Sequence, residues 1–539
     1  MCGIWAFINP EGYNLTSLFN DFMKIKHRGP DFSNFQIYNN TVIGFHRLSI
    51  MDLSFKSNQP YVLKENNKTI VFVCNGEIYN YKELIKNYNL PIDTKSDCLT
   101  LPQLYLKLAF NEFIQLFIDE VKGEFAFLLF EFDEDNKLQN LVAGRDSIGI
   151  RPLYYSEPKI CNEPMIFSSE IKGCSSFDGP IKEFPPGHIL YYTFNNKSSI
   201  PITKFEFNML YEKSKLQSLP EIDSLKNIKI SVINSIARRL DSDQPMAFLL
   251  SGGVDSSLVA AIASKVMNKH IKTFCCGMNK GSDLKYAKMV ANYIGSDHTE
   301  VIFTPEEGLQ AINDVIYTTE TWDTTTIRAS VGQYLVSKYI SQNTDAKVLF
   351  VGEGPDEVCS SYLFNYYAPD PELIHSTAIE FVSKIHYFDL KRSDRCIARW
   401  GLEARVALLD PEFIETYWKI PSNERHPITK GIEKWWLRQA FEYDNLLPKE
   451  VLWRKKEAFS DGVSGTENSW FQIIQDYIQE KYNMTEKEYY KHKFIELFGE
   501  KRLDVIPHYW QPKWNKDGTD VSIYVDPSAR TLDIYNKTK

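Results

Sequence analysis

Short apolar runs separated by turn-forming residues fill much of the first third of the chain. Residues 69–74 and 125–130 are two such runs, and Asn-Gly, Asp or Gly signals bound them. Runs of this length that are rich in β-branched and aromatic residues are typical of buried strands. A β-rich domain is therefore predicted to include residues 42–155.

The pattern changes near residue 205. Residues 194–220 are polar and lack a sustained apolar period, which predicts a linker. Beyond it, helical spacing alternates with apolar strands; the helices are expected at 222–240 and 256–267, the strands at 247–250 and 271–276, and a largely helical region at 373–443. Such alternation predicts a parallel sheet with crossover helices. Two domains follow, 1–205 and 206–539.

Composition narrows the class of protein. A chain of 539 residues is too long for one ordinary core, and an apolar fraction of 43% excludes a disordered chain. The net charge of −9 arises without a basic block, so no nucleic-acid partner is expected. Nine cysteines without a CxxC pair suit a reducing cytosol. Because neither a signal peptide nor a membrane-spanning run is evident, we expect a cytoplasmic protein without a membrane partner.

The sharpest local signal is Ser251-Gly252-Gly253-Val254-Asp255-Ser256-Ser257, which follows an apolar strand and precedes a helix. Backbone N–H groups at such a turn, together with the positive end of the helix, form an anion cradle. Asp255 would tolerate a phosphate group only through a cation, so Mg²⁺ is predicted. The alternative is a glycine-rich turn with a serine cap.

A second acidic turn follows the apolar run 348–351. It reads Gly352-Glu353-Gly354-Pro355-Asp356-Glu357 and stands where ligands bind in open α/β sheets. Asp356 is the second predicted Mg²⁺ ligand, and Glu353 is the candidate for positioning groups or transferring a proton. The alternative is a solvated acidic loop.

Cys2 directly follows Met1. Removal of Met1 would place a thiol of pKa ~8.5 and an α-amine of pKa ~7.7–8 on one residue, so that the nucleophile would carry its own base. The alternative is an inert cysteine near a chain end.

The motifs that follow Cys2 resemble those of the N-terminal-nucleophile amidotransferases. They are residues 27–31, 46–52, 74–80, 96–97, 144–153 and 167–172. The resemblance implies an α+β glutaminase domain, an αββα sandwich, in which Cys2 is the nucleophile and Asn75 and Gly76 form the oxyanion hole. It also implies a glutamine site made by Arg47, Leu48, Ser49, Ile50, Met51, Asn75, Gly76, Glu77 and Asp97. Arg47 would bind the α-carboxylate of glutamine, and Asp97 its α-ammonium.

The second half is similar to the asparagine synthetases of the eukaryotic type. The similarity rests on the SGGxDS loop of ATP pyrophosphatases and on residues 320–330, 431–434, 453–462, 508–514 and 526–532. It implies an α/β ATP-pyrophosphatase domain in which Thr325, Thr326 and Arg328 bind aspartate and Lys434 stabilises charge. The implied ATP and pyrophosphate site comprises Leu250, Ser251, Gly252, Gly253, Asp255, Ser256, Cys276, Val351, Gly352 and Asp356.

Together the two resemblances imply one coupled reaction. Cys2 releases ammonia from glutamine, while the β-carboxylate of aspartate attacks the α-phosphorus of MgATP to give β-aspartyl-AMP and pyrophosphate. Ammonia then displaces AMP, after passing through an internal tunnel. The substrates would be glutamine, aspartate and ATP, and a homodimer is compatible with the resemblance.

The sequence departs from the usual family motifs at three places: Pro355, residues 359–361, and Ala407-Leu408. Proline removes one N–H donor from a phosphate-facing loop, which would lower the synthetase rate and ATP affinity. Rival classes are a β-lactam-forming synthetase, which usually lacks the cysteine, and a phosphoribosyl amidotransferase, which residues 251–257 disfavour. A weakened glutaminase, or a regulatory binder of glutamine or adenylate, also remains open.

Overall fold

The structure of the protein, a computed structural model, describes residues 1–65, 67–158, 163–194, 202–207, 220–279, 281–457, 462–464 and 469–507. The tail motifs at 508–514 and 526–532 lie outside these residues, as do residues 458–461 of the motif at 453–462. None of the described helices combines the length and apolar character needed to cross a membrane.

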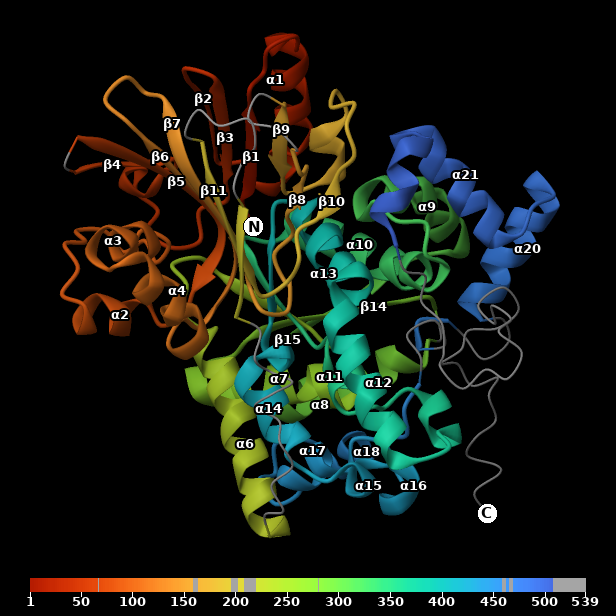
Figure 1. Ribbon diagram of the computed structural model, residues 1–539. Coiled ribbons are helices and arrows are strands. Elements are labelled where there is room, and N and C mark those ends of the chain that lie inside the picture. Colours follow the sequence, from red (N-terminus) through yellow and green to blue (C-terminus); the bar gives the residue numbers. More distant parts are fainter. Residues whose placement is uncertain are drawn as a thin grey trace.

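Two six-stranded sheets form the first domain (Figure 1). Their orders are β10-β8-β9-β1-β3-β2 and β12-β11-β7-β6-β5-β4. The strands are β1 (Gly3–Ile8), β2 (Phe32–Tyr38), β3 (Thr41–Arg47), β4 (Tyr61–Glu65), β5 (Lys68–Ile78), β6 (Gly123–Phe132), β7 (Leu138–Arg145), β8 (Tyr154–Tyr155), β9 (Met165–Ser168), β10 (Lys182–Glu183), β11 (His188–Thr193) and β12 (Ile202–Glu206).

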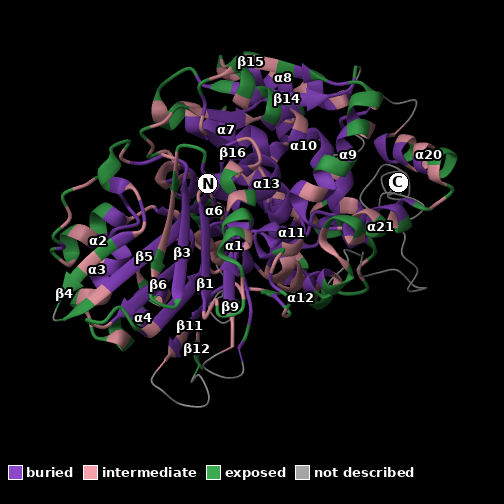
Figure 2. Cartoon of the chain, turned by 90° about the horizontal axis from the view of Figure 1, so that it is seen from above, coloured by how far each residue is buried: buried purple, intermediate pink, exposed green. Residues whose placement is uncertain are grey.

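Alternate residues of these strands face different apolar layers. In β1, Ile4 and Ala6 lie in the layer between the sheets, whereas Trp5 and Phe7 pack on the other side with α1. The outer face of the second sheet packs against the helices α2 to α4. The helices are α1 (Leu15–Lys24), α2 (Tyr81–Asn87), α3 (Thr100–Lys107) and α4 (Phe110–Asp119). Because both faces of each sheet are covered, β1, β3, β5 and β6 are buried (Figure 2), and the predicted αββα sandwich is confirmed.

The predicted strands at 69–74 and 125–130 lie within β5 and β6. The linker prediction for 194–220 is wrong over 202–206, because β12 pairs with β11 there and extends the second sheet. Its side chains are mostly exposed and show no apolar alternation, so backbone pairing defines this strand. Residues 195–201 and 208–219 of the expected linker lie outside the described residues.

A five-stranded parallel sheet, in the order β15-β14-β13-β16-β17, forms the centre of the second domain. Its strands are β13 (Met246–Leu249), β14 (Lys272–Gly277), β15 (Asp297–Ile302), β16 (Val348–Val351) and β17 (Glu403–Val406). The main helices are α6 (Glu221–Arg238), α7 (Val254–Met267), α8 (Ser282–Ile294), α9 (Pro305–Thr319), α10 (Thr324–Asn343) and α13 (Asp389–Ala398). In Figure 1, α7 and α8 lie on one side of this sheet and α10 and α13 on the other. The strand order reverses between β13 and β16, which is where open α/β sheets bind ligands.

The region 373–443 is largely helical, as predicted, but it also contains the edge strand β17. This strand was not predicted, because it has only four residues, two of which, Glu403 and Arg405, form a buried ion pair. The remaining helices of the domain are α11 (Pro355–Val358), α12 (Pro371–Lys384), α14 (Pro411–Trp418), α15 (Ser422–Arg425), α16 (Pro427–Lys430), α17 (Trp435–Ala440), α18 (Lys449–Leu452), α20 (Trp470–Tyr482) and α21 (Glu486–Phe498).

The two domains meet around the chain start. The amine of Met1 donates to the carbonyl of Leu402, directly before β17, at 3.4 Å. Arg28 of the first domain binds Asp394 of α13 at 2.8 Å, and both side chains are buried. The N-terminus therefore lies at the domain interface, near the centre of Figure 1.

Candidate functional site

Cys2 lies just before β1 and is partly buried. Its Sγ is 3.8 Å from the carbonyl oxygen of Leu48, and its backbone carbonyl accepts a hydrogen bond from Arg28 Nε at 2.9 Å. Burial raises the pKa of the Cys2 thiol to about 11 and lowers the pKa of the Met1 amine to about 6. The thiol therefore needs a nearby base or cation before it can attack a substrate.

Asn75 and Gly76 belong to β5, where they pair with Ala126 and Phe125 of β6, and do not form a hairpin turn. Asn75 is fully buried, and neither its Oδ1 nor its Nδ2 has a partner among the described residues. A Cβ at Gly76 would lie 2.1 Å from the carbonyl oxygen of Glu124, so this close strand contact requires glycine. An unpaired buried amide is costly to the fold and marks a place where a polar ligand atom would be stabilised.

Two buried carboxyl groups lie near this amide. Asp97 accepts a hydrogen bond from the Ile78 N–H at 2.6 Å, yet burial raises its pKa to about 6. Burial, Asp97 and Glu403 together raise the pKa of Glu77 well above its usual value, and Arg405, at 3.9 Å, only partly opposes them. A cationic ligand would stabilise both carboxylates.

The guanidinium group of Arg47 holds the loop that follows it. It donates to the carbonyl of Ser54 at 2.8 Å and to Asn58 Oδ1 at 2.6 Å, and it also reaches the carbonyl of Met51 at 3.2 Å. Much of its fork is therefore engaged by residues 51–58. A bound carboxylate would have to exchange with some of these bonds.

The predicted residues 48–51 are brought together beside Cys2. Leu48 offers its carbonyl to the thiol, and the Ser49 N–H donates to Asp31 at 2.8 Å. The carbonyl of Ile50 accepts from the N–H of Asp243 in the second domain at 3.1 Å. This loop thus contacts the segment that leads into β13.

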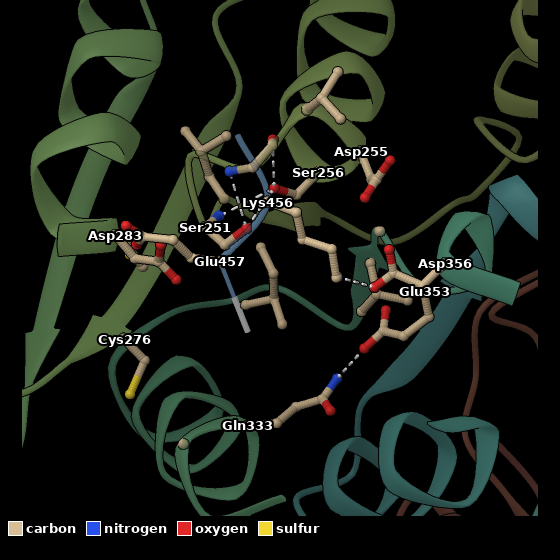
Figure 3. A pocket seen from close by; sticks show the side chains of 18 of the residues that line it. Ser251, Asp255, Ser256, Cys276, Asp283, Gln333, Glu353, Asp356, Lys456 and Glu457 are labelled. Atoms are coloured by element: carbon tan, nitrogen blue, oxygen red, sulfur yellow. Dashed lines mark hydrogen bonds and ion pairs between the residues drawn. The ribbon is translucent and has the colours of Figure 1, made fainter. Parts of the chain in front are cut away.

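A pocket of ≈ 210 Å³ opens at the carboxyl ends of β13, β14 and β16 (Figure 3). Of the predicted residues, it is lined by Leu250, Ser251, Gly253, Asp255, Ser256, Cys276, Val351, Gly352, Glu353, Asp356 and Lys434. Gly252 does not line it, but it has φ +73° and its Cβ would come within 2.5 Å of Tyr286 Cβ. A glycine is therefore required for the turn.

The serine hydroxyls tie this turn together. Ser251 Oγ lies 2.9 Å from Ser256 Oγ, and the Gly253 N–H donates to Ser251 Oγ at 3.3 Å. The helix α7 begins at Val254, so its positive end faces the pocket beside these donors. Such an arrangement suits an anion such as a phosphate group.

Lys434 bridges the two predicted metal ligands. Its Nζ contacts Asp255 and lies 2.6 Å from Asp356 Oδ1, while Lys456 lies 2.6 Å from Asp356 Oδ2. Although burial acts in the opposite direction, Lys434 and Lys456 lower the pKa of Asp356; the two carboxylates likewise raise the pKa of Lys434 against its burial.

The two carboxylates converge on one cation, and Asp255 Oδ1 is buried without a partner among the described residues. No group of three or more His, Cys, Asp or Glu side chains in the described part of the chain could hold a metal ion alone. Asp255 and Asp356 therefore suit a divalent cation that also takes oxygen ligands from a bound phosphate.

The three residues predicted to bind aspartate, Thr325, Thr326 and Arg328, lie at the start of α10 and do not line this pocket. Thr326 donates to Asp323, the N-cap of the helix, at 2.7 Å. Arg328 Nε binds Glu486 Oε1 at 2.9 Å, and Thr325 Oγ1 is buried without a partner in the described structure. The geometry does not bring these three residues to the phosphate cradle, and their assignment stays a prediction.

Sequence reasoning missed several charged or polar pocket residues. These are Asp283, Gln333, Asp389, Arg392, Arg438, Arg454, Lys456 and Glu457. The motif at 453–462 contains three of them, but its sequence did not indicate a separate role for any of the three. Gln333 on α10 and Arg392 on α13 have no local motif, because tertiary packing brings them to the pocket.

The residues that depart from the family motifs fit their local structure. Pro355 is the first residue of α11, where a missing N–H costs no helical bond, and it does not line the pocket. Ser361 donates to the carboxylate of Asp356. Ala407 and Leu408 are buried directly after β17. The expected loss of a phosphate donor therefore finds no support at Pro355.

Comparison with known proteins gives matches over nearly all of the chain. A family model described as a glutamine amidotransferase domain matches residues 1–207, and one described as asparagine synthase matches residues 227–375 and 367–523. Proteins named asparagine synthetase [glutamine-hydrolyzing] from Bos taurus and Homo sapiens are 39% and 38% identical over 579 residues, with 99% of each chain covered. The Rattus norvegicus protein of this name is 39% identical over 582 residues, with full coverage of both chains.

Proposed function

Since the chain belongs to the glutamine-hydrolysing asparagine synthetases, we propose which of its residues perform each step of asparagine synthesis. The enzyme makes L-asparagine from L-aspartate with ATP and with ammonia from glutamine, through β-aspartyl-AMP, and yields glutamate, AMP and pyrophosphate. Family membership favours this reaction over a regulatory role as a glutamine or adenylate binder.

Cys2 is the proposed nucleophile of the glutaminase step. Removal of Met1 by hydrolysis of the peptide bond would free the α-amine of Cys2 itself, which can accept the thiol proton. The thiolate attacks the amide carbon of glutamine, and the Asn75 amide and the Gly76 N–H stabilise the oxyanion; loss of one such donor typically raises a barrier by ~2.7–4 kcal/mol. The unpaired amide of Asn75 supports this role.

The glutamine backbone is proposed to bind between opposite charges. Its α-ammonium would neutralise the repulsion between Glu77 and Asp97, which are buried together. Its α-carboxylate would bind Arg47 in exchange for loop acceptors such as the carbonyl of Ser54. Residues 48–51 then close the site beside Cys2.

The phosphates of ATP are proposed to bind residues 250–256, with Val351, Gly352 and Cys276 lining the same pocket. Asp255 and Asp356 would hold Mg²⁺, which when bound neutralises charge on the phosphate oxygens. Lys434 lies between these carboxylates and can stabilise charge that develops during attack by aspartate. Glu353 would orient the reacting groups or transfer a proton.

Four further assignments are proposals. Thr325, Thr326 and Arg328 would bind aspartate if the start of α10 opens toward the pocket. The domain boundary is placed near residue 205, since β12 is the last described strand of the second sheet and α6 begins at Glu221. A homodimer and a cytoplasmic location complete the proposal; the described cysteines are all unpaired, which suits a reducing compartment.

One observation carries the coupling of the two sites. Cys2 lies near β17, because, besides burial, Glu403 at the start of that strand raises the pKa of the Cys2 thiol; β17 in turn pairs with β16. Ammonia released at Cys2 therefore forms near the amino end of β17, whereas the pocket opens beyond the carboxyl ends of β13, β14 and β16.

Product analysis tests the proposed function. The enzyme is incubated with L-aspartate, L-glutamine and MgATP, and asparagine, glutamate, AMP and pyrophosphate are quantified together. Cys2→Ala should lose glutamine-dependent synthesis and keep synthesis from ammonia. The matched control is Cys174→Ala, which should keep both activities. Cys174 is buried in the apolar layer on the outer face of the first sheet. Equal loss of both activities in Cys2→Ala would refute the assignment of Cys2.

A further inference from the structure

Gln333 stands on α10 with its amide aimed at the ATP pocket. The residue is 4% exposed and lines the pocket. Its Nε2 donates to Glu353 Oε1 at 3.1 Å, and Figure 3 shows this contact across the pocket wall. A helix that packs against the sheet thus presents one polar side chain to the acidic turn after β16.

Packing alone does not account for a glutamine at this position. Gln333 Oε1 and Glu353 Oε2 are both buried and lack hydrogen-bond partners within the described structure. The buried neighbours Val331 and Val336 on the same helix are apolar. A methionine of similar length would fill the space without introducing the unsatisfied Oε1 acceptor of Gln333. The fold therefore tolerates the free-energy cost of a buried, unsatisfied amide oxygen, and the same side chain donates a hydrogen bond to Glu353.

No other described side chain supplies Glu353 with a comparable donor. Arg392 Nη2 is 3.6 Å from Glu353 Oε1, beyond hydrogen-bond length, and it lies closer to Asp389, at 3.2 Å. The charge of Arg392 is thus divided between two carboxylates. Gln333 is thus the described side chain within hydrogen-bond distance of the Glu353 carboxylate.

We propose that Gln333 is a positioning residue for the synthetase reaction, in which its side-chain amide holds the Glu353 carboxylate in a reactive orientation. This inference rests on the proposed function of Glu353. Fixing a carboxylate that acts in the transition state favours kcat, whereas the phosphate cradle that binds ATP does not involve Gln333.

Two variants of Gln333 test the inference. Gln333→Met removes the donor and keeps the length of the side chain; Gln333→Glu keeps its shape and replaces the donor with an acceptor. In ammonia-dependent synthesis, each should lower kcat by about tenfold or more, the usual scale for a lost hydrogen bond to a charged group. The KM for ATP should change by less than about twofold, because uniform binding is retained. Gln342→Met, an exposed glutamine on the same helix, is the matched control and should match the wild type in both parameters.

The outcomes separate this inference from the proposed function. If Glu353→Gln keeps the wild-type rate, the role of Glu353 fails and the inference fails with it. If Glu353→Gln loses synthesis while Gln333→Met keeps the wild-type kcat, the inference alone is overturned. A fall of glutaminase activity or thermal stability in proportion to kcat would assign Gln333 a merely structural part and would also overturn it.

Discussion

The buried carboxylate of Asp394 should control the glutaminase from the other domain. It accepts hydrogen bonds from Arg28 Nη1 at 2.8 Å and Nη2 at 3.1 Å, and from Arg395 at 2.6 Å. Arg28 in turn donates to the carbonyl of Cys2 at 2.9 Å. The substitution Asp394→Asn therefore removes a charge that holds the arginine against Cys2, the proposed nucleophile.

The size of the effect follows from the burial of the pair. The Arg28 side chain is fully buried and that of Asp394 is 4% exposed, and breaking one partner of such a pair typically costs about 3–5 kcal/mol. Glu170 still binds Arg28 at 2.7 Å, so the loss should lie near the lower end of this range. We expect the free energy of unfolding to fall by about 3 kcal/mol.

Activity should change selectively in Asp394→Asn. Glutamine-dependent synthesis should fall, because Cys2 loses its fixed carbonyl, whereas synthesis from ammonia should change little. Urea unfolding and the two synthesis assays measure these effects. Asp93→Asn is the control, since Asp93 pairs with Lys56 on the surface and is 78% exposed. Unchanged unfolding and unchanged glutamine-dependent synthesis in Asp394→Asn would refute the reasoning.

The same pair predicts a pH dependence of stability. Burial would raise the pKa of Asp394, but Arg28 and Arg395 outweigh it and hold the pKa below its usual value. The unfolded pKa is about 3.9, so the contribution of this carboxylate is fully present above that pH and is lost as the pH falls toward the lower folded value. Asp394→Asn should therefore show a smaller acid-induced loss of stability below about pH 4 than the wild type.

Three further substitutions test other parts of the structure. Lys434→Ala should reduce synthesis from ammonia by roughly a hundredfold or more and leave glutamine hydrolysis nearly unchanged; parallel loss in both assays would contradict this. Asp243→Ala removes an acceptor that binds the Asp52 N–H at 2.9 Å, so steady-state kinetics should show a higher KM for glutamine and an unchanged KM for ammonia. Gly76→Ala places a Cβ 2.1 Å from the carbonyl of Glu124, so glutaminase activity should disappear, and a fully active variant would disprove the steric argument.

Much of the fold could be predicted because hydrophobic spacing and secondary structure agree. The predicted strand at 348–351 coincides with β16, and the helix at 256–267 lies within α7. Among the strands that were not predicted, β12 is mostly exposed without apolar alternation and β17 has only four residues. Their place in a sheet depends on backbone pairing with a neighbour, which a local pattern does not encode.

The candidate sites divide along a similar line. The family resemblance assigned Cys2 and Asn75 to one site, whereas Ser251 and Asp356 were assigned to the other because each belongs to a turn that follows an apolar strand. Gln333 could not be predicted in this way, since nothing in its local sequence separates it from other polar residues on helices. Its importance depends on the distance from α10 to the turn after β16, and only the folded chain supplies that distance.

The strand β17 connects the two proposed sites. Its Val406 pairs with Val351, the last residue of β16, while Arg151 of the first domain donates to the carbonyl of Ala404 at 3.0 Å. Arg405 lies 3.9 Å from Glu77 of the proposed glutamine site and binds Glu403 at 3.1 Å. β17 thus contacts the first domain through buried groups and pairs with the strand that precedes the turn holding Glu353. The buried charges of β17 are thus among the groups through which the two domains contact each other.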